Sequence, residues 1–576
     1  MSHIARSSLI IAIFFGLEKV LGMLRSILIA QVFGLSSDLD VYNVANNLPD
    51  LIFALIIGGA LAIALIPVLS ETREKEGRPA LWDLFSRVAN LVFLVTGVLS
   101  ILVAIFAQPL VERVIAPGFN SEQKLLVIEL MRLNLIATLF FSLGGLLISG
   151  LQANQHFLLP AIAPSMYDLG ALFGILFLVP ENGYQVGPLT LPAFGLGVRG
   201  LVYGTILGAM LFFLIQLPGL VIYRFRWSPA IHLRHAGVLR VLHLLGPRIL
   251  MVLLIQVIFI AQDNLASFLS TGTVTALVYG WLIMQFPETV IGTTIGTVFL
   301  PTLSEQATRG GHQGIRPTVQ RWLRWGLPVA LVLIMAIRGE DLAFLGPLAP
   351  ETNGALWVIK GLLLAALGLW LLPRVLQTLR AEAGNEFSQS LQRSLRAILA
   401  LTIPVTALLM VVVKPFVGLL GFEDAGQELV AWTARAFLLG LVGHSLLEVS
   451  MRAFYAQQDA YTPLITYILL AAAYILGAAV LSPLMGAPGF GLANSLAFTL
   501  EALLLWYLLR RCFPGQLGVG STLGRALLSA LVGGLLALGV MQLPFPALPL
   551  AVGAAGLGGL AALPFIWPEI KLLVNM

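Results

Sequence analysis

Three charged residues lie within the first long apolar run of the sequence. Glu18, Lys19 and Arg25 interrupt the segment LIIAIFFGLEKVLGMLRSILIAQVFG, which covers residues 9–34. Each charge costs roughly 2.5–3.5 kcal/mol at the centre of a membrane helix, so such residues usually face a protein interior or a water-filled cavity. At about 100° per residue, the three side chains share one sector of about 120° with Gly22 and Ser26. The pattern predicts one polar face on an apolar helix, on which Lys19 and Arg25 could bind an anion.

These cations also have a plainer interpretation. Glu18 and Lys19 could simply pair with each other, and Arg25 could extend to the membrane interface. Other charged residues lie in or beside apolar runs, and Asp168 and Glu501 are two whose orientation the sequence does not reveal. Asp40 and Arg452 are further candidates for substrate binding. The candidates for ion binding or gating are Glu18, Asp263, Glu288 and Glu448. For isolated acids a structural role is an equally good interpretation, and Arg452 could serve only as a topology signal or as a partner of a helix dipole.

Several functional classes leave no trace in the sequence. The seven histidines show no metal-ligand spacing, no Walker A sequence occurs, and the single Cys512 excludes an intramolecular disulfide. The net charge of +5 is most simply explained by basic cytoplasmic loops, so nucleic acid is a poor candidate partner. We therefore expect no cofactor, no metal and no enzymatic activity.

The composition is that of a protein with many membrane spans. Of the 576 residues 58% are hydrophobic and only 11% are charged, and the mean hydropathy is +0.94. A soluble domain carries about 25% charged residues. Stretches of about 20 residues, long enough to cross a bilayer, recur sixteen times: near 9–33, 45–68, 86–110, 125–150, 158–180, 198–222, 247–270, 276–301, 323–345, 355–376, 396–420, 429–455, 462–484, 488–510, 521–543 and 546–567.

Loop charges indicate the orientation of these spans. If the N-terminus is cytoplasmic, basic residues such as Arg73, Lys75, Arg224 and Arg226 all fall in cytoplasmic loops, whereas the opposite loops, such as TGT and SPLMGAP, are nearly free of charge. Cytoplasmic loops of membrane proteins carry an excess of Lys and Arg. Both termini are therefore predicted to be cytoplasmic.

The sequence also repeats itself. The segment 41-VYNVANNLPD-50 matches 278-VYGWLIMQFPE-288, and 67-PVLSE-71 matches 301-PTLSE-305. Later, 151-LQANQHFLLP-160 matches 454-FYAQQDAYTP-463. These matches predict two six-helix units that run in parallel orientation, an arrangement known from transporters.

The offset between the halves predicts an insertion. It grows from 234 residues between Glu71 and Glu305 to 303 residues between Gln155 and Gln458, a gain of 69 residues. We assign this gain to an added helix pair at about 306–376, which we expect on the outside of the bundle. The expected domains are a first lobe at 1–226, a second lobe at 227–515 that includes the insertion, and a C-terminal helix pair at 516–576.

One family shares these features. The run 22-GMLRSILIAQVFGLSSDLDVYNVANNLP-49, together with 116-APGF-119, 265-LASFL-269 and 453-AFYAQQD-459, resembles the MurJ (MviN) lipid II flippases of the MOP superfamily. The resemblance covers nearly the whole chain except the insertion. It implies an all-α membrane protein with two six-helix lobes in a V around a cationic cavity. It also implies a C-terminal helix pair that forms a groove for a polyprenyl tail, which suits two spans that carry only Arg525 near one end; an ordinary lipid-facing pair is the alternative.

The resemblance further implies a function and a location. Such proteins carry undecaprenyl-pyrophosphate-linked peptidoglycan precursor (lipid II) across the bacterial cytoplasmic membrane by alternating access, so a lipid-linked glycan and membrane lipids are the expected partners. Lys19 and Arg25 match positions of cavity cations, and Asp40 matches an acid near the cavity mouth. Fixed cations suit a pyrophosphate, because the arginine fork matches phosphate oxygens.

The sequence departs from the family pattern at two cation positions. Phe53 stands at an arginine position and Gly58 at a glutamate, while Trp281 and Leu282 stand where the family often has aspartate and arginine. Two alternatives therefore stay open, namely an exporter of another polyprenyl-linked glycan and an ion-coupled multidrug exporter of the same superfamily. A membrane glycosyltransferase or ligase usually needs a long outer loop, and the outer loops here are short.

Overall fold

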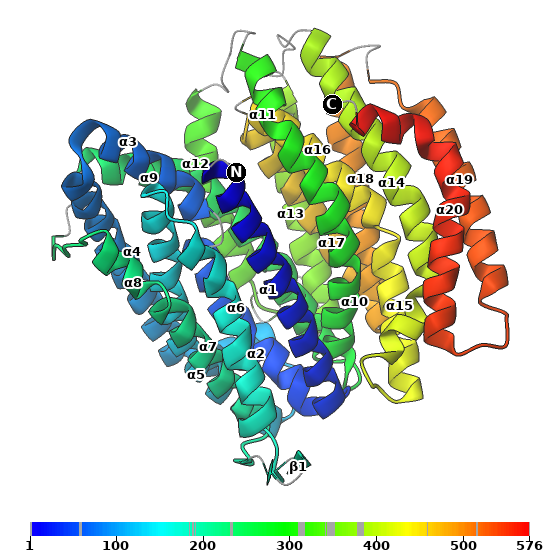
Figure 1. The fold of residues 1–576 in the computed structure, drawn as a ribbon, viewed down its shortest axis with the longest axis horizontal. Coiled ribbons are helices and arrows are strands. Elements are labelled where there is room, and N and C mark those ends of the chain that lie inside the picture. The colour runs from blue at the N-terminus through cyan, green and yellow to red at the C-terminus, as the bar shows by residue number, and fades with distance from the viewer. Residues whose placement is uncertain are drawn as a thin grey trace. The chain divides into compact units, whose positions relative to one another are not determined.

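The protein is almost entirely helical in the computed structural model, which describes residues 3–56, 60–183, 185–186, 189–190, 192–230, 234–308, 317–339, 341, 352–376, 385–457, 459–513 and 517–574. Two compact units divide the chain, Met1–Ile260 and Ala261–Met576. In bilayer hydrocarbon every backbone polar group needs an internal partner, which favours helices for such apolar segments. Figure 1 shows the helices in chain order from blue to red.

The first unit holds the helices of the first lobe and the beginning of α9. Its helices are α1 (His3–Phe33), α2 (Ser37–Ile56), α3 (Ala60–Glu76), α4 (Arg78–Leu110), α5 (Ser121–Ala153), α6 (Leu158–Phe173), α7 (Val198–Leu214), α8 (Leu217–Ile222) and most of α9 (Ala236–Ala266). Two π-helical turns, η1 (Val111–Ile115) and η2 (Gly174–Leu178), extend α4 and α6, and a two-stranded antiparallel hairpin pairs β1 (Gln185–Val186) with β2 (Leu189–Thr190).

The second unit holds the second lobe, the insertion and the C-terminal pair. Its helices are α10 (Thr273–Glu288), α11 (Thr294–Thr308), α12 (Pro317–Ala336), α13 (Asn353–Leu376), α14 (Asn385–Gly418), α15 (Asp424–Leu438), α16 (Leu441–Ala456), α17 (Tyr461–Met485), α18 (Ala487–Cys512), α19 (Gly520–Val540) and α20 (Ala547–Val574), with the π-helical turn η3 (Thr289–Thr293) between α10 and α11.

The number of helices that could span a membrane differs from the sixteen expected. Among the described residues, twelve are long and apolar enough, or thirteen if the bent pair α15 and α16 counts as one span. The other three predicted spans do not meet this length and composition criterion within the described residues. The span at 9–33 carries three charges, the span at 45–68 is divided between α2 and α3, and the span at 323–345 keeps only a short apolar helix at 326–336. Residues 57–59, 309–316 and 342–351 lie outside the described residues.

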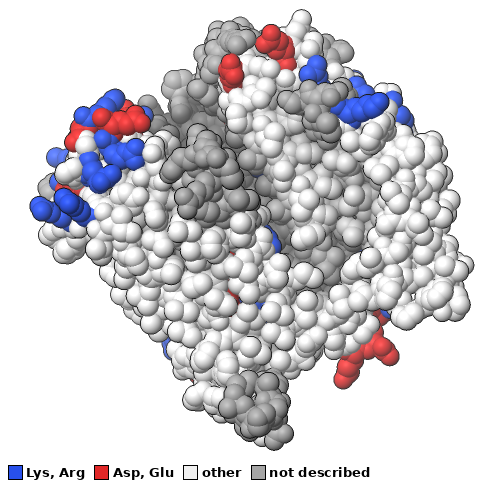
Figure 2. Space-filling view, in the orientation of Figure 1, with Lys and Arg blue, Asp and Glu red and all other residues white. Residues whose placement is uncertain are grey.

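Charged side chains are unevenly distributed over the surface. On the face drawn in Figure 2, charged side chains gather in small patches, and most of the described surface between them is uncharged. This distribution suits a protein surrounded by lipid, because a charge in the bilayer core is costly.

Helix crossings at small residues support the internal repeat. In the first lobe, α6 and η2 cross α7 so closely that a Cβ at Gly200 would lie 2.8 Å from the Leu178 carbonyl carbon. In the second lobe, a Cβ at Gly489 would lie 2.7 Å from the carbonyl carbon of Leu481. Leu178 and Leu481 are separated by the same 303 residues that align the Gln155 and Gln458 signatures. The two halves therefore share this close contact between helix backbones as well as the repeated sequence segments.

The inserted helix α13 packs along α17. Gly361 faces Leu476, and Gly368 faces Leu469, so both glycines allow a close approach. On α6, the repeat counterpart of α17, the position that corresponds to Leu476 is Phe173, which is exposed. Helix α13 thus covers α17 at a position whose counterpart on α6 is exposed, and its place as an added helix outside the six-helix unit stays a prediction.

A buried lysine joins the two inserted helices. Lys360 Nζ of α13 donates to the Met335 carbonyl oxygen at 3.0 Å, in the last turn of α12, and lies 4.7 Å from the Trp357 ring centroid. A cation is favourable at a helix C-terminus, where carbonyl groups lack partners. Lys360 therefore caps α12 and orients it on α13.

The C-terminal pair packs on α14. Small residues allow close contact between α19 and α20, where a Cβ at Gly533 would lie 2.7 Å from the Gly558 carbonyl oxygen. Near the other end, Glu569 of α20 is buried and forms ion pairs with Arg396 of α14 and Arg525 of α19. The pair is thus held by charge as well as by apolar packing, and Glu569 lies just beyond the predicted span that ends at 567.

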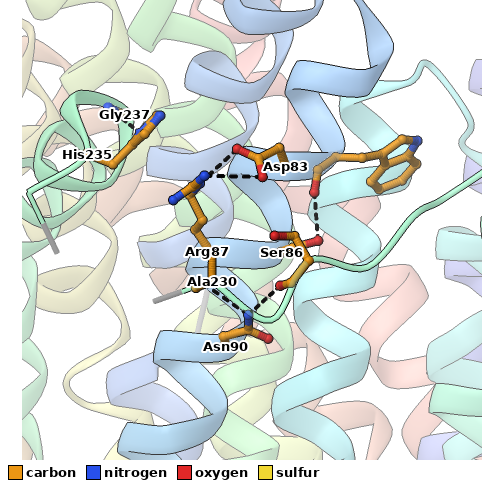
Figure 3. A network of polar contacts seen from close by, with 9 residues as sticks. Asp83, Ser86, Arg87, Asn90, Ala230, His235 and Gly237 are labelled. Atoms are coloured by element: carbon orange, nitrogen blue, oxygen red, sulfur yellow. Dashed lines mark hydrogen bonds and ion pairs between the residues drawn. The ribbon is translucent and has the colours of Figure 1, made fainter. Parts of the chain in front are cut away.

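The segment after α8 is fastened to α4. The Asn90 side-chain amide donates to the carbonyl oxygens of Ser228 at 2.7 Å and Ala230 at 3.2 Å, and its oxygen accepts from Trp227 Nε1 at 2.9 Å. Figure 3 shows this contact beside the Asp83–Arg87 ion pair. The start of α9 then joins the core of the first unit, where Val238 packs with residues of α3 and α4.

Candidate functional site

Arg25 is the centre of a polar cluster in the first lobe. Its Nη1 atom lies 2.9 Å from Asp168 Oδ1, and its guanidinium group lies 4.8 Å from the centroid of the Tyr167 ring. Both partners are on α6, which packs against α1. The Arg25 side chain keeps 25% of its surface exposed, whereas Asp168 keeps 3%. Arg25 therefore pairs inside the lobe and does not extend away from it.

Glu18 and Lys19 form the pair that one interpretation expected. Their charged atoms are 3.3 Å apart, and Lys19 Nζ lies 5.1 Å from the Phe15 ring centroid. Half of the Lys19 side chain is nevertheless exposed. Lys19 is therefore a partly neutralised but accessible cation.

Helix α2 adds two groups to the cluster that the sequence reasoning did not select. Asp50 lies within electrostatic range of Arg25, and Tyr42 lies within range of Tyr167 and Arg25. Asp50 is exposed although it lies past the middle of α2. The sequence did hold a signal, because residues 42, 46 and 50 recur every four positions on one helix face.

The charge balance of this cluster is not strongly cationic. Lys19 and Arg25 supply two positive charges, whereas Glu18, Asp50 and Asp168 supply three carboxyl groups. These five groups therefore combine two cations with a larger number of acids, and the expected cationic site stays a prediction.

A series of aromatic contacts runs from Phe53 to Tyr167. Phe53 packs edge-on against Phe141 with 5.5 Å between ring centroids, and Phe141 packs against Tyr167 at 5.1 Å. Tyr167 in turn supports the Arg25 guanidinium group. Phe53 thus belongs to the aromatic packing that continues through Phe141 and Tyr167 to Arg25, and it adds no charge to the cluster.

Asp40 lies apart from any exposed surface. It is 2% exposed in the first turn of α2, where a negative charge is favourable to the helix dipole. The buried position of Asp40 indicates a structural role, in addition to the substrate-binding role that the resemblance implies.

The second lobe brings three of the sequence candidates together. Arg452 of α16 pairs with Glu448 one turn earlier, with Nη2 and Oε2 2.9 Å apart, and its Nη1 donates to the Thr293 carbonyl oxygen at 2.9 Å. Glu288, at the end of α10, accepts from Thr293 Oγ1 at 3.1 Å and lies within electrostatic range of Arg452 and Glu448.

The backbone at this second cluster is specialised. Thr293 ends the π-helical turn η3, and such turns occur frequently at functional sites. Gly296 lies one turn further on, and a Cβ there would overlap Arg452 Nη1. The glycine therefore leaves the space that Arg452 fills.

The remaining candidates lie elsewhere in the second unit. Asp263 is buried near the end of α9, next to Gln262, which accepts a hydrogen bond from Tyr474 of α17 at 2.8 Å. Trp281 packs edge-on against His444 with 5.4 Å between ring centroids, and Leu282 is exposed.

The repeated proline signature ends in an ion pair. Glu71 of α3 lies beyond the predicted span and accepts from Lys75 and from Arg240 of α9, each at 2.6 Å. These two cations hold the pKa of Glu71 below its usual value. The signature therefore joins α3 to α9 at the end of the lobe. Among the described residues, no group of three His, Cys, Asp or Glu side chains could hold a metal ion.

A family model decides what kind of protein carries these clusters. The model described as "Lipid II flippase MurJ" matches residues 29–339 and 357–545. The chain belongs to the MurJ family. The gap in the match, residues 340–356, falls within the predicted insertion. Flippases are transporters, so family membership confirms that this member is not an enzyme, and it is a multi-pass protein of the bacterial inner membrane.

Individual relatives agree with this assignment. The lipid II flippase MurJ of Burkholderia cenocepacia is 27% identical over 516 residues, which cover 88% of this chain and 84% of that protein. A probable lipid II flippase MurJ of Buchnera aphidicola from Acyrthosiphon pisum is 27% identical over 319 residues, or 59% of its length.

The fold of this MurJ family member matches solved structures. A lipid II flippase MurJ in an inward closed conformation covers 98% of this chain with a TM-score of 0.69 at 18% identity, and the match covers 100% of that chain. An inward-facing MATE transporter of the MOP superfamily covers 86% of this chain and 94% of its own with a TM-score of 0.55 at 13% identity. The predicted all-α fold is confirmed.

Proposed function

We propose that this MurJ family member moves lipid II from the inner to the outer face of the cytoplasmic membrane by alternating access. The observation that carries the proposal is Arg25, an arginine inside a membrane helix that is held in place by α6 yet keeps a quarter of its side chain exposed. A guanidinium group in this state can bind the pyrophosphate through two parallel hydrogen bonds. Family membership makes lipid II the first substrate to test.

Other residues have proposed roles in the same cycle. Lys19 adds a second accessible cation in the first lobe, and Arg452 with Glu288 and Glu448 forms the corresponding cluster of the second lobe. A further proposed substrate contact is Asp40, and the proposed ion or gating residues include Glu18 and Asp263.

The proposed topology has both termini in the cytoplasm, because that orientation places the basic loops inside. The lobes are proposed to divide at 226/227, and the C-terminal pair 516–576 is proposed to receive the polyprenyl tail. A lipid-linked glycan and membrane lipids are the proposed partners, and no nucleic acid is involved.

A second candidate function follows from the charge balance of the first cluster. Three carboxyl groups beside two cations also suit a cationic ligand, as in an ion-coupled exporter of the MOP superfamily. Binding measurements with the purified protein separate the two. Lipid II should bind if the protein is a flippase, whereas an exporter should bind organic cations in its place.

The proposed function is tested in a bacterial strain depleted of its own lipid II flippase. We expect expression of this protein to restore growth and cell shape, while an empty vector does not. A variant with Asp83→Asn, which removes a carboxylate from an ion pair of α4 outside the cluster, should rescue equally well. Failure of the correctly inserted wild-type protein would favour another polyprenyl-linked glycan as substrate.

A further inference from the structure

Asp168 is a buried acid for which the proposed function has no role. It lies in the middle of α6 with 3% of its side chain exposed, and its carboxylate contacts Arg25 of α1. Burying a carboxylate is costly unless a partner compensates for the lost water. Glu18 and Lys19 of α1 also lie within electrostatic range of Asp168. Helix α1 therefore supplies positive charges that compensate the carboxylate and one negative charge that repels it.

The surface of α1 accommodates this carboxylate. A Cβ at Gly22 would lie 3.8 Å from both Asp168 oxygens, so the carboxylate rests against the helix at its glycine. Arg25 follows Gly22 by three residues and therefore lies on the same face. Ser26 Oγ donates to the Gly22 carbonyl oxygen at 2.9 Å, which leaves that carbonyl satisfied within α1.

Arg25 and Asp168 form an ion pair without the two parallel hydrogen bonds of a bidentate pair. Nη1 and Oδ1 are 2.9 Å apart, but Nη1 does not reach hydrogen-bond geometry with any described acceptor. A bidentate arginine–carboxylate pair would use two parallel N–H groups. Here Asp168 holds the charge from its buried side, and the ring of Tyr167 supports the guanidinium plane.

We propose that Asp168 is an internal competitor for Arg25, which holds the guanidinium group in the empty site and yields it to the substrate pyrophosphate. The inference rests on the proposed function. A carrier must release its cargo, and affinity is set mostly by the dissociation rate. Because the Asp168 carboxylate competes with the pyrophosphate for Arg25, it weakens substrate binding and speeds substrate release. Asp168 is thus a positioning residue that sets the affinity of the site.

The test uses Asp168→Asn, which keeps the shape of the side chain but removes its charge. Purified protein in nanodiscs is titrated with undecaprenyl pyrophosphate, and dissociation is followed after dilution. We expect binding about 10-fold tighter than in the wild type, slower dissociation and slower transport. Asp83→Asn is the matched control, because it neutralises an acid in another arginine pair of the same lobe, and it should leave binding unchanged.

The outcomes separate the competitor role from a merely structural one. A structural role predicts weaker binding and a lower melting temperature for Asp168→Asn. Should that variant fail to fold, Asp168→Ser provides the same neutralisation, because a serine hydroxyl can bond to a carbonyl of its own helix. Adding Arg25→Gln should abolish the gain in affinity.

The result also distinguishes this inference from the proposed function. If the wild type binds undecaprenyl pyrophosphate and the neutral variants bind equally or more weakly, Asp168 is not a competitor and the proposed function stands. If neither the folded wild type nor the folded variants bind the probe, the proposed function fails and the inference fails with it.

Discussion

Replacing Arg25 with alanine is expected to abolish lipid II transport while the protein stays in the membrane. Arg25 carries the exposed positive charge that α6 positions in the first lobe, and Phe53 offers no second cation beside it. Two lost charge-assisted hydrogen bonds correspond to about 3 kcal/mol, or a loss of transport of roughly 100-fold. The measurement is rescue of a flippase-depleted strain, with membrane levels followed by immunoblotting.

Graded variants sharpen this test. Arg25→Lys should rescue only partly, because an ammonium group keeps the charge but loses the planar fork. Lys19→Ala should cost less than Arg25→Ala, since Glu18 at 3.3 Å already offsets part of its field. Arg87→Ala, which removes an arginine from an i,i+4 pair on α4, is the control and should transport normally. Normal transport by Arg25→Ala would show that the charge on α1 is structural.

The second large effect is expected from Gly296→Ala in the second lobe. The added methyl group would overlap Arg452 Nη1, so the guanidinium group must move away from the Thr293 carbonyl that Nη1 contacts. We expect transport to fall by roughly 10-fold or more, as in Arg452→Ala, because a hydrogen bond from a charged group contributes about 1.5–3 kcal/mol. Transport by each variant is compared at equal membrane abundance.

A double variant tests whether the two residues act together. Gly296→Ala combined with Arg452→Ala should be no worse than Arg452→Ala alone, since the clash disappears with the arginine. Gly539→Ala on α19 is the matched control, because nothing lies within 4 Å of a Cβ there. Full activity of Gly296→Ala, or an additive loss in the double variant, would contradict this description of the site.

Periodicity and repeats in the sequence predicted the fold and one face of the first cluster. The polar sector of α1 was visible because helical spacing alone places Glu18, Lys19 and Arg25 together. The Glu448–Arg452 pair follows the same rule, since its members are one turn apart. The repeat was visible because matched segments recur, as in 67-PVLSE-71 and 301-PTLSE-305.

Contacts between helices could not be predicted in this way. Nothing in the sequence indicates that Asp168 meets Arg25, because the two residues are joined only by the packing of α6 on α1. Asp50 belongs to the repeated segment 41-VYNVANNLPD-50, and this repetition alone does not indicate that its side chain lies near Arg25. The expected count of sixteen spans is not confirmed, since twelve or thirteen helices among the described residues are long and apolar enough, and hydropathy does not reveal that α2 and α3 divide one apolar run.

The most direct test of the proposed function measures lipid II at the outer face of the membrane. Cells depleted of their own flippase and expressing this protein are treated with an externally added enzyme that cleaves lipid II, and the cleaved fraction is quantified. The proposal predicts cleavage restored to the level of undepleted cells by the wild type but not by Arg25→Ala. Lipid II that stays protected while the wild-type protein is abundant and correctly inserted would contradict a lipid II flippase.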